Sequence, residues 1–341
     1  MRQLLPLLIL PTFLPAQSDF LKDPDIVWAA EIEQDWVVDQ PSLENEFDEG
    51  INTLKLLRTE QNAGIWSNPY FSRLVFQAML NHKLPIFKDP QCSVPSQLSD
   101  FYTVICKLVT FDPEHPHRPV DTTSIPPDLA PDVKVWRLRQ VLAYHQKSAS
   151  WSTTVEAIAP LVPVLGLTGD TAAFRPLFWF RPGDKRQDLG SNHIVWAIET
   201  KNKQLTTRVP TDQPNLVKVT DGFQNPLSHM LKTIQTDMKT PFYGAWNEQP
   251  LTPEERRSML TRSDTVVTFD PEMYEEKVTV VQNDMNPSDI KQLRLVQTWY
   301  WDERRARLSI CLDAVGLLKD VFDGEGNFRY SIPLAYRRAK H

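Results

Sequence analysis

The residues best suited to bind a metal ion gather in one short stretch. His115 and His117 are flanked by Asp112 and Glu114. Imidazole nitrogens and carboxylate oxygens are ligands for Zn²⁺, but a site needs three or four of them converging on one point. A related stretch later in the chain has Met273 and Glu275 in the corresponding region, and no third ligand is placed near them. We therefore expect a solvated loop here and no metal site.

A run of charged residues, Asp302 to Arg307, lies where a hairpin turn should join two strands. Such a turn could contact a partner protein. The alternative is a solvated turn kept soluble by mixed charge. The corresponding turn earlier in the chain is His145-Gln-Lys-Ser148, with Lys147 in place of the charged run, so the fold does not require that run. The candidate partner-binding residues are Asp302, Glu303, Arg304, Arg305 and Arg307.

Two dense aromatic runs, Phe178 to Phe180 and Trp299 to Trp301, stand in predicted strands. Consecutive residues of a strand point to opposite faces. One face is therefore buried, and the other is either covered or an exposed apolar contact surface. These rings could stack on a sugar or form a subunit interface. Core plus interface is favoured, because no set of polar sugar-binding residues accompanies them.

Catalytic and cofactor motifs find no support in the sequence. No Ser-His-Asp, Cys-His or paired-carboxylate arrangement has supporting context. The chain contains neither GxxxxGK nor GxGxxG, the glycine-rich loops that cradle phosphates. We therefore predict no catalytic residue and no cofactor.

An internal repeat organises these residues. Residues 137–181 align without a gap on residues 294–338, a shift of 157, with twelve identities in forty-five positions. Val109 to Glu114 recurs letter for letter as Val267 to Glu272. Ile26-Val27-Trp28 returns at residues 194–196. Because a repeat of this length indicates two copies of one unit, we divide the chain at residue 184.

The predicted domains are 18–184 and 185–341, each of about 150 residues and with its own core. A helix is expected from residue 68 to 83, where apolar residues recur every three or four positions. Prolines predict an irregular connection over residues 115–132. Strands are predicted over 133–145, 153–165 and 177–181. Consecutive strands with short turns favour an α+β fold, with a mainly antiparallel sheet and one or two helices in each copy.

Residues 1–17 resemble a cleavable signal peptide, with one positive charge and an apolar run from Leu4 to Leu14. We therefore expect export to the periplasm. Cys92 and Cys106 could form a disulfide, whereas Cys311 lies in an apolar alternation typical of a buried residue. The net charge of −6 argues against nucleic-acid binding.

Several short motifs resemble the GldN/PorN family of gliding-motility and type IX secretion proteins. They are Asp25 to Trp28, Asp132 to Leu138, Ile158 to Val162, Arg175 to Phe180 and Thr298 to Asp302. The resemblance implies a non-enzymatic periplasmic subunit of a larger ring assembly. It implies as partners an outer-membrane lipoprotein and the periplasmic part of an inner-membrane motor. The alternative is a periplasmic carbohydrate- or peptide-binding module that uses the aromatic strands.

Overall fold

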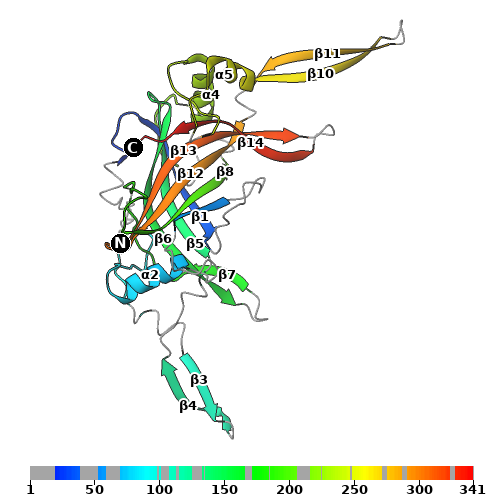
Figure 1. Ribbon diagram of the computed structural model, residues 1–341. Helices are drawn as coiled ribbons and strands as arrows, with labels where there is room; N and C mark the ends of the chain where they lie inside the picture. Colours follow the sequence, from blue (N-terminus) through cyan, green and yellow to red (C-terminus); the bar gives the residue numbers. More distant parts are fainter. Residues whose placement is uncertain are drawn as a thin grey trace, which may run out of the picture.

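The computed structural model describes most of the chain (Figure 1). The described residues are 20–38, 53–58, 70–97, 100, 107–112, 115–124, 133, 135–165, 171–183, 185–205, 216–223, 225–245, 248–270, 275–285, 290–322 and 327–340. The predicted signal peptide and Cys106 lie outside them.

The described residues form three short helices and fourteen strands. The helices are α2 (Tyr70–Leu80), α4 (Pro226–Thr236) and α5 (Pro253–Leu260). The strands of the first half are β1 (Ile26–Val37), β2 (Thr53–Arg58), β3 (Lys107–Asp112), β4 (His115–Ser124), β5 (Val135–His145), β6 (Ser150–Leu165) and β7 (Thr171–Pro176). Those of the second half are β8 (Ile194–Leu205), β9 (Leu216–Val219), β10 (Thr261–Asp270), β11 (Glu275–Asp284), β12 (Ile290–Asp302), β13 (Arg307–Phe322) and β14 (Phe328–Arg338).

Two five-stranded antiparallel sheets form the body. The first sheet has the order β7-β6-β5-β1-β9, and the second has the order β14-β13-β12-β8-β2. Adding 157 to the residue numbers of β5, β6 and β7 gives positions in β12, β13 and β14. These strands have the same order in both sheets, so the strand order agrees with the repeat. The fold is therefore mostly antiparallel β, with the helices as short additions.

The halves exchange one strand each. β2 follows β1 in the chain but pairs with β8, where Leu54 lies opposite Thr200. β9 follows β8 but pairs with β1, where Ala29 lies opposite Lys218. Each sheet is thus completed by a strand from the other half. The domain boundary between 18–184 and 185–341 stays a prediction. In both sheets, strands from the two sides of this boundary are paired.

Each sheet bends at a β-bulge in the same place. The β5–β6 register shifts at Gln140, and the β12–β13 register shifts at Gln297, which is 157 residues later. The extra residue is Glu156 in β6 and Asp313 in β13, because neither has an opposite residue in the ladder. A bulge bends its strand and increases the local twist, so both sheets curl.

The two bulges meet inside the molecule. The Nε2 of Gln297 donates a hydrogen bond to Oε1 of Gln140 at 2.8 Å, and both residues are fully buried. Repeat-equivalent residues in direct contact place this pair where the two halves face each other. The other two amide atoms of the pair have no hydrogen-bond partner among the described residues.

The first core cluster draws residues from both halves. The ring of Phe71 on α2 packs against two tryptophans. Its centroid lies 4.5 Å from that of Trp196 and 4.7 Å from that of Trp136. Trp299 and Trp301 surround the same ring. Three of these four tryptophans belong to the second half, although α2 belongs to the first.

The second core cluster reverses the roles. Leu227 and Met230 on α4 are buried beside Trp151 and Tyr144 of the first half. The indole N–H of Trp151 points at the sulfur of Met230, 3.4 Å away. The hydroxyl of Tyr144 also lies 2.9 Å from the Nδ1 of His229. The expectation of a separate core in each half is therefore wrong, because each helix covers a core built by both sheets.

The position of α2 follows the prediction. α2 lies within the helix expected over 68–83. At the start of α5, Glu255 N–H donates to Thr252 Oγ1 and Thr252 N–H donates to the Glu255 carboxylate, a capping box. Among the described residues, no helix has the length and apolar character needed to cross a membrane.

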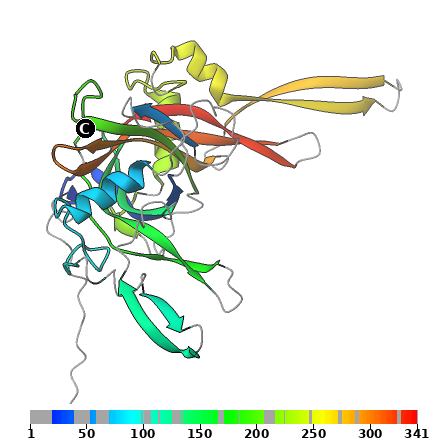
Figure 2. The same ribbon diagram turned by 60° about the horizontal axis from the view of Figure 1, so that its bottom comes forward.

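Two hairpins stand apart from the body, at opposite ends of it in both views (Figures 1 and 2). We call β3–β4 the first arm and β10–β11 the second arm; each is a separate two-stranded sheet. The irregular connection predicted over 115–132 is wrong for residues 115–124, which form β4, and residues 125–132 lie outside the described residues. Prolines are tolerated there because both strands are edges, and the register shifts beside Pro119.

The end of the first repeat also differs from expectation. A strand was predicted over 177–181, whereas β7 runs from Thr171 to Pro176. The proline does not by itself end the strand, because the equivalent Pro333 lies inside β14, which continues to Arg338. Trp179 instead exchanges two backbone hydrogen bonds with Phe87, and Phe180 exchanges two with Ile158.

Candidate partner-binding surfaces

The predicted charged turn forms the β12–β13 hairpin connection. Asp302 is buried, and its Oδ1 accepts a hydrogen bond from the Arg305 N–H at 3.0 Å. Glu303 is exposed, and its N–H donates to the His193 carbonyl at 2.9 Å. Ala306 closes the turn with φ of 48°, a left-handed conformation that costs about 1 kcal/mol for a residue with a Cβ. Asp302 therefore shapes the turn rather than facing a partner.

The turn's arginines are all exposed, but they differ in their surroundings. Arg304 and Arg305 lie at the turn itself. Arg307 begins β13 beside Gly183, where a Cβ would lie 2.8 Å from the Arg307 Nε. Arg305 also lies 3.8 Å, Nε to Oδ2, from the buried carboxylate of Asp302, so the turn uses its charge in part, whereas Arg304 is exposed at the turn.

The equivalent turn of the first half contains a polar cluster that the sequence did not reveal. His145 occupies the position of Asp302 and is buried. Its Nε2 lies 2.7 Å from Ser152 Oγ, and its Nδ1 lies 3.6 Å from an Asp23 carboxylate oxygen and 3.7 Å from one of Asp25. Lys340, near the C-terminus, approaches Nδ1 to 3.4 Å. The cluster ties both ends of the described chain together.

This cluster has the composition of a catalytic triad but the wrong proton positions. A lysine ammonium can only donate, so Lys340 makes the Nδ1 of His145 an acceptor. In the tautomer that this contact requires, the ring proton lies on Nε2 and faces Ser152 Oγ, so the imidazole does not accept the serine proton. Burial, and secondly the Lys340 charge, lower the pKa of His145. The arrangement supports a structural role.

The two bulge acids are paired with arginines. Asp313 accepts hydrogen bonds from Arg186, in the segment between the halves, and from Thr298 Oγ1 at 2.5 Å. Glu156 accepts from Arg139 Nε at 2.8 Å, and Arg139 also lies 2.7 Å from Glu31. Since a buried carboxylate is costly without a partner, these pairs stabilise the bulges.

The aromatic runs do not form a binding face. All six side chains, Phe178 to Phe180 and Trp299 to Trp301, are buried, with exposed fractions of 5% or less. Rings that are covered on both strand faces cannot stack on a sugar. The carbohydrate-binding alternative that used these residues is therefore wrong.

The metal candidates lie on the first arm. His115 and His117 belong to β4, and Glu114 lies outside the described residues. The described part of the chain contains no group of three or more His, Cys, Asp or Glu residues that could hold a metal ion. Cys92 is a free cysteine, half-buried, and burial raises the pKa of its thiol to about 11.

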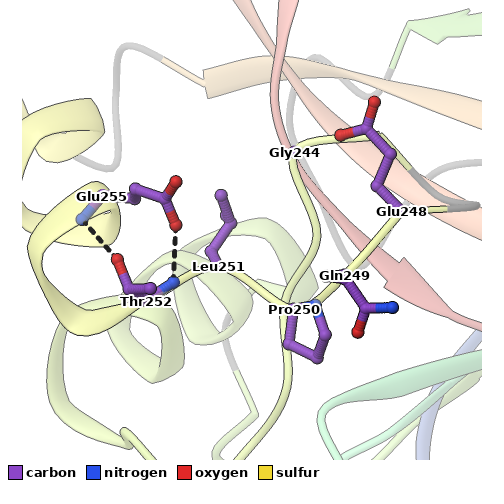
Figure 3. Close-up of a pocket in the computed structure, with 7 residues that line it drawn as sticks. All are labelled: Gly244, Glu248, Gln249, Pro250, Leu251, Thr252 and Glu255. Atoms are coloured by element: carbon purple, nitrogen blue, oxygen red, sulfur yellow. Dashed lines mark hydrogen bonds between the residues drawn. The ribbon is translucent and has the colours of Figure 1, made fainter.

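Two surface hollows lie beside the loops that follow α2 and α4. The larger, of about 540 Å³, is shown in Figure 3. It is lined by Gly244, Glu248, Gln249, Pro250, Leu251, Thr252 and Glu255. Hydrogen bonding to the Thr252 N–H holds the pKa of Glu255 below its usual range, so this carboxylate is committed to the helix cap.

The smaller hollow, of about 480 Å³, occupies the related place after α2. It is lined by Met79, His82, Leu84, Pro85, Ile86, Ser96 and Gln97. In this loop Asp100 accepts from the Gln97 N–H at 3.0 Å, as Glu255 does from Thr252. Both hollows are open surface features without a catalytic grouping.

Comparison with known families gives one match. The GldN family, described as "Gliding motility associated protein GldN", matches residues 56–209 and 198–337. The chain belongs to the GldN family. The two matched segments are consistent with a tandem arrangement and place the protein among components of the gliding-motility and type IX secretion machinery. No curated protein matches the chain.

Sequence reasoning missed the residues that join the two halves. β2 and β9 were not predicted, because six and four residues are too few to show a clear period. One signal was present. Gln140 and Gln297 are identical amides in strands that are otherwise largely apolar, as expected of a pair that must hydrogen-bond inside a core.

Proposed function

We propose that this GldN-family protein is a non-enzymatic periplasmic subunit that works by binding other proteins of the gliding and type IX secretion machinery. The observation that carries the proposal is the family match across residues 56–337. Export through the predicted signal peptide, residues 1–17, would deliver the protein to the periplasm. The partners that the family resemblance implies are an outer-membrane lipoprotein and the periplasmic part of an inner-membrane motor.

Exposed apolar residues near the sheet edges support a binding role. Phe174 on β7 is 45% exposed, and Phe328 and Ile332 on β14 are 51% and 42% exposed. β7 and β14 are outer strands of the two sheets. Large apolar side chains at such edges are typical of protein contact sites.

The repeat offers related surfaces twice within one chain. Head-to-tail contacts between such surfaces close into a ring or propagate as a filament. This geometry supports the proposal that the protein is part of a ring assembly. It also allows the two halves to hold different partners, since the β12–β13 turn carries two arginines and a glutamate whereas the β5–β6 turn carries one charged residue, Lys147.

The test reverses charge at the exposed turn. Arg304→Glu with Arg305→Glu should reduce capture of the lipoprotein or of the motor's periplasmic part at least tenfold in a pull-down, because oppositely charged groups at an interface discriminate strongly against like charge. The matched control is Lys147→Glu with Ser148→Glu at the equivalent turn. Adding Arg307→Glu gives a third variant that also perturbs the Gly183 contact. Circular dichroism reports folding.

Two outcomes would count against the proposal in different ways. Undiminished capture by the Arg304/Arg305 variant would make the turn a solvated loop and leave other surfaces as the contact. Normal gliding and secretion in a strain without the gene would remove the functional proposal itself.

A further inference from the structure

The last residues that the structure describes join the two sheets. We call residues 339–340, which follow β14, the C-terminal tail. The N–H of Ala339 donates to the carbonyl of Asp313 on β13 at 2.9 Å, and the N–H of Lys340 donates to the carbonyl of Trp151 on β6 at 2.9 Å. β13 belongs to the second sheet and β6 to the first. The C-terminal tail therefore passes from one sheet to the other, and it does so beside the buried His145.

The segment before β1 reaches the same place from the other end of the chain. The carbonyl of Asp25 accepts the N–H of Gln146, at the start of the β5–β6 turn, at 3.0 Å. Lys218 on β9 donates from Nζ to the carbonyls of Leu21 at 2.7 Å and Asp23 at 3.1 Å. These bonds to the backbone hold the carboxylates of Asp23 and Asp25 next to the histidine, whatever the side chains around them do.

The two carboxylates each have one oxygen committed to the backbone and one that faces the histidine. Oδ1 of Asp23 accepts the N–H of Asp25 at 2.9 Å, and Oδ1 of Asp25 accepts the N–H of Lys147 at 2.8 Å. The two Oδ2 atoms lie 3.6 and 3.7 Å from Nδ1 of His145. The same two atoms lie 3.4 and 3.7 Å from Nζ of Lys340. His145 and Lys340 thus face the same pair of carboxylate oxygens.

The histidine and the lysine differ in their access to water. The side chain of His145 is 4% exposed, whereas that of Lys340 is 44% exposed. A neutral imidazole can accept a hydrogen bond from the Lys340 ammonium, but an imidazolium donates from both nitrogens and cannot. A buried imidazolium also needs a carboxylate at hydrogen-bond distance, because a buried charge without a partner is costly. Lys340 is therefore the group that can leave the carboxylates and return to water.

The charged groups around His145 come from four parts of the fold. They are Asp23 and Asp25 before β1, Lys218 on β9, Lys340 in the C-terminal tail, and Arg337 on β14, which donates to the Ser148 carbonyl of the same turn at 3.0 Å. Burial, and secondly the charge of Lys340, lowers the pKa of His145, while the two carboxylates oppose the shift. Because linkage is reciprocal, a lysine that disfavours the proton is itself disfavoured in its place by the proton.

We propose that Asp23, Asp25, His145 and Lys340 form a proton-operated clasp, which holds the C-terminal tail while His145 is neutral and releases it when His145 is protonated. The inference goes beyond the proposed function and does not depend on it. Release belongs to the range below the ordinary histidine pKa of about 6.5. The hydrogen bond from the Asp25 N–H holds the pKa of Asp23 below its usual range, so this carboxylate is still ionised when His145 takes up its proton.

Hydrogen exchange followed by mass spectrometry tests the clasp in the full chain. Between about pH 7.5 and 5.5, the peptide that contains residues 339–340 should lose about tenfold in protection, after correction for intrinsic exchange rates. Peptides from β13 should keep theirs, because the sheets stay paired. His145→Gln retains an acceptor for Lys340 but cannot take up a proton, so its tail should stay protected at both pH values. His229→Gln, at another buried histidine site, is the matched control and should behave like the wild type.

Nuclear magnetic resonance titration of His145 provides a second measurement that does not need the histidine replaced. Lys340→Met should move the titration of His145 to higher pH, because it removes the cation next to Nδ1. Lys239→Met, at an exposed lysine of the loop after α4, should leave it in place. An unchanged titration in Lys340→Met would overturn the clasp, and so would equal loss of tail protection in His145→Gln and wild type. If His145→Gln fails to fold, the titration decides.

Discussion

The two halves build the same bulge and stabilise it with different charges. Glu156 in the first half pairs with Arg139 from a neighbouring strand. Asp313 in the second half pairs with Arg186, which comes from the segment between the halves. The backbone geometry is kept, because a bulge sets the curl of a sheet. The position of the pairing arginine is not kept, because any guanidinium that reaches the buried carboxylate can donate hydrogen bonds to it.

The hairpin turns show the same freedom. Ala149 and Ala306 have almost the same left-handed φ, 45° and 48°. In the second half Asp302 itself accepts the backbone N–H of Arg305. In the first half that position is His145, and Asp25 accepts the backbone N–H of Lys147 instead. Equivalent backbones can thus be held by non-equivalent side chains, and the two turns carry different sets of charged residues.

The largest expected effect tests whether the halves fold as one unit. Phe71→Ala removes the ring packed among tryptophans of both halves and should lower the free energy of unfolding by about 3–5 kcal/mol. Leu227→Ala, at the matching position of α4, should cost about 2–5 kcal/mol. Both should shift a single denaturation transition followed by tryptophan fluorescence, because each core is shared.

The control for these substitutions is Leu80→Ala, on the exposed side of α2, which should change stability by less than about 0.5 kcal/mol. Two separate transitions, only one of which moves with Phe71→Ala, would show that the halves unfold independently despite their exchanged strands.

An intermediate effect should separate the two bulge acids. Asp313→Asn removes the charge from a fully buried side chain with hydrogen bonds to Arg186 and Thr298, at a cost of about 1.5–3 kcal/mol. Glu156→Gln should cost less than about 1 kcal/mol, since Arg139 retains Glu31 as a partner. Urea denaturation measures both. Equal losses would mean that the second carboxylate near Arg139 gives no compensation.

The smallest expected effect is the pH dependence caused by His145. Its pKa is lowered in the folded state, so near neutral pH and below the unfolded chain binds more protons. Stability is therefore complete above the ordinary histidine pKa of about 6.5 and falls as pH drops below it, by at most about 1.4 kcal/mol per pH unit for one group.

His145→Gln should flatten this slope between pH 7 and 5. Part of the slope should remain, because burial also lowers the pKa of His229. His229→Gln, alone and combined with His145→Gln, separates the two contributions. An unchanged slope in the His145 variant would assign the dependence to other groups.

The sequence by itself determined the repeat, the main strands and the helix ends. An alternating run such as that of β5 specifies a half-buried strand, and Thr252 with Glu255 specifies a helix start, because both signals depend on neighbours within a few residues. The GldN motifs were readable for the same reason. The matched segments of the family confirm that resemblance.

Only the tertiary structure decided how the repeats combine. A shift of 157 shows that two copies exist, but it does not show that β2 joins β8 or that β9 joins β1. Strand partners are chosen by contacts between residues far apart in the chain, which no local pattern records. The burial of the aromatic runs was decided in the same way, because whether the second face of a strand meets solvent depends on the layer packed against it.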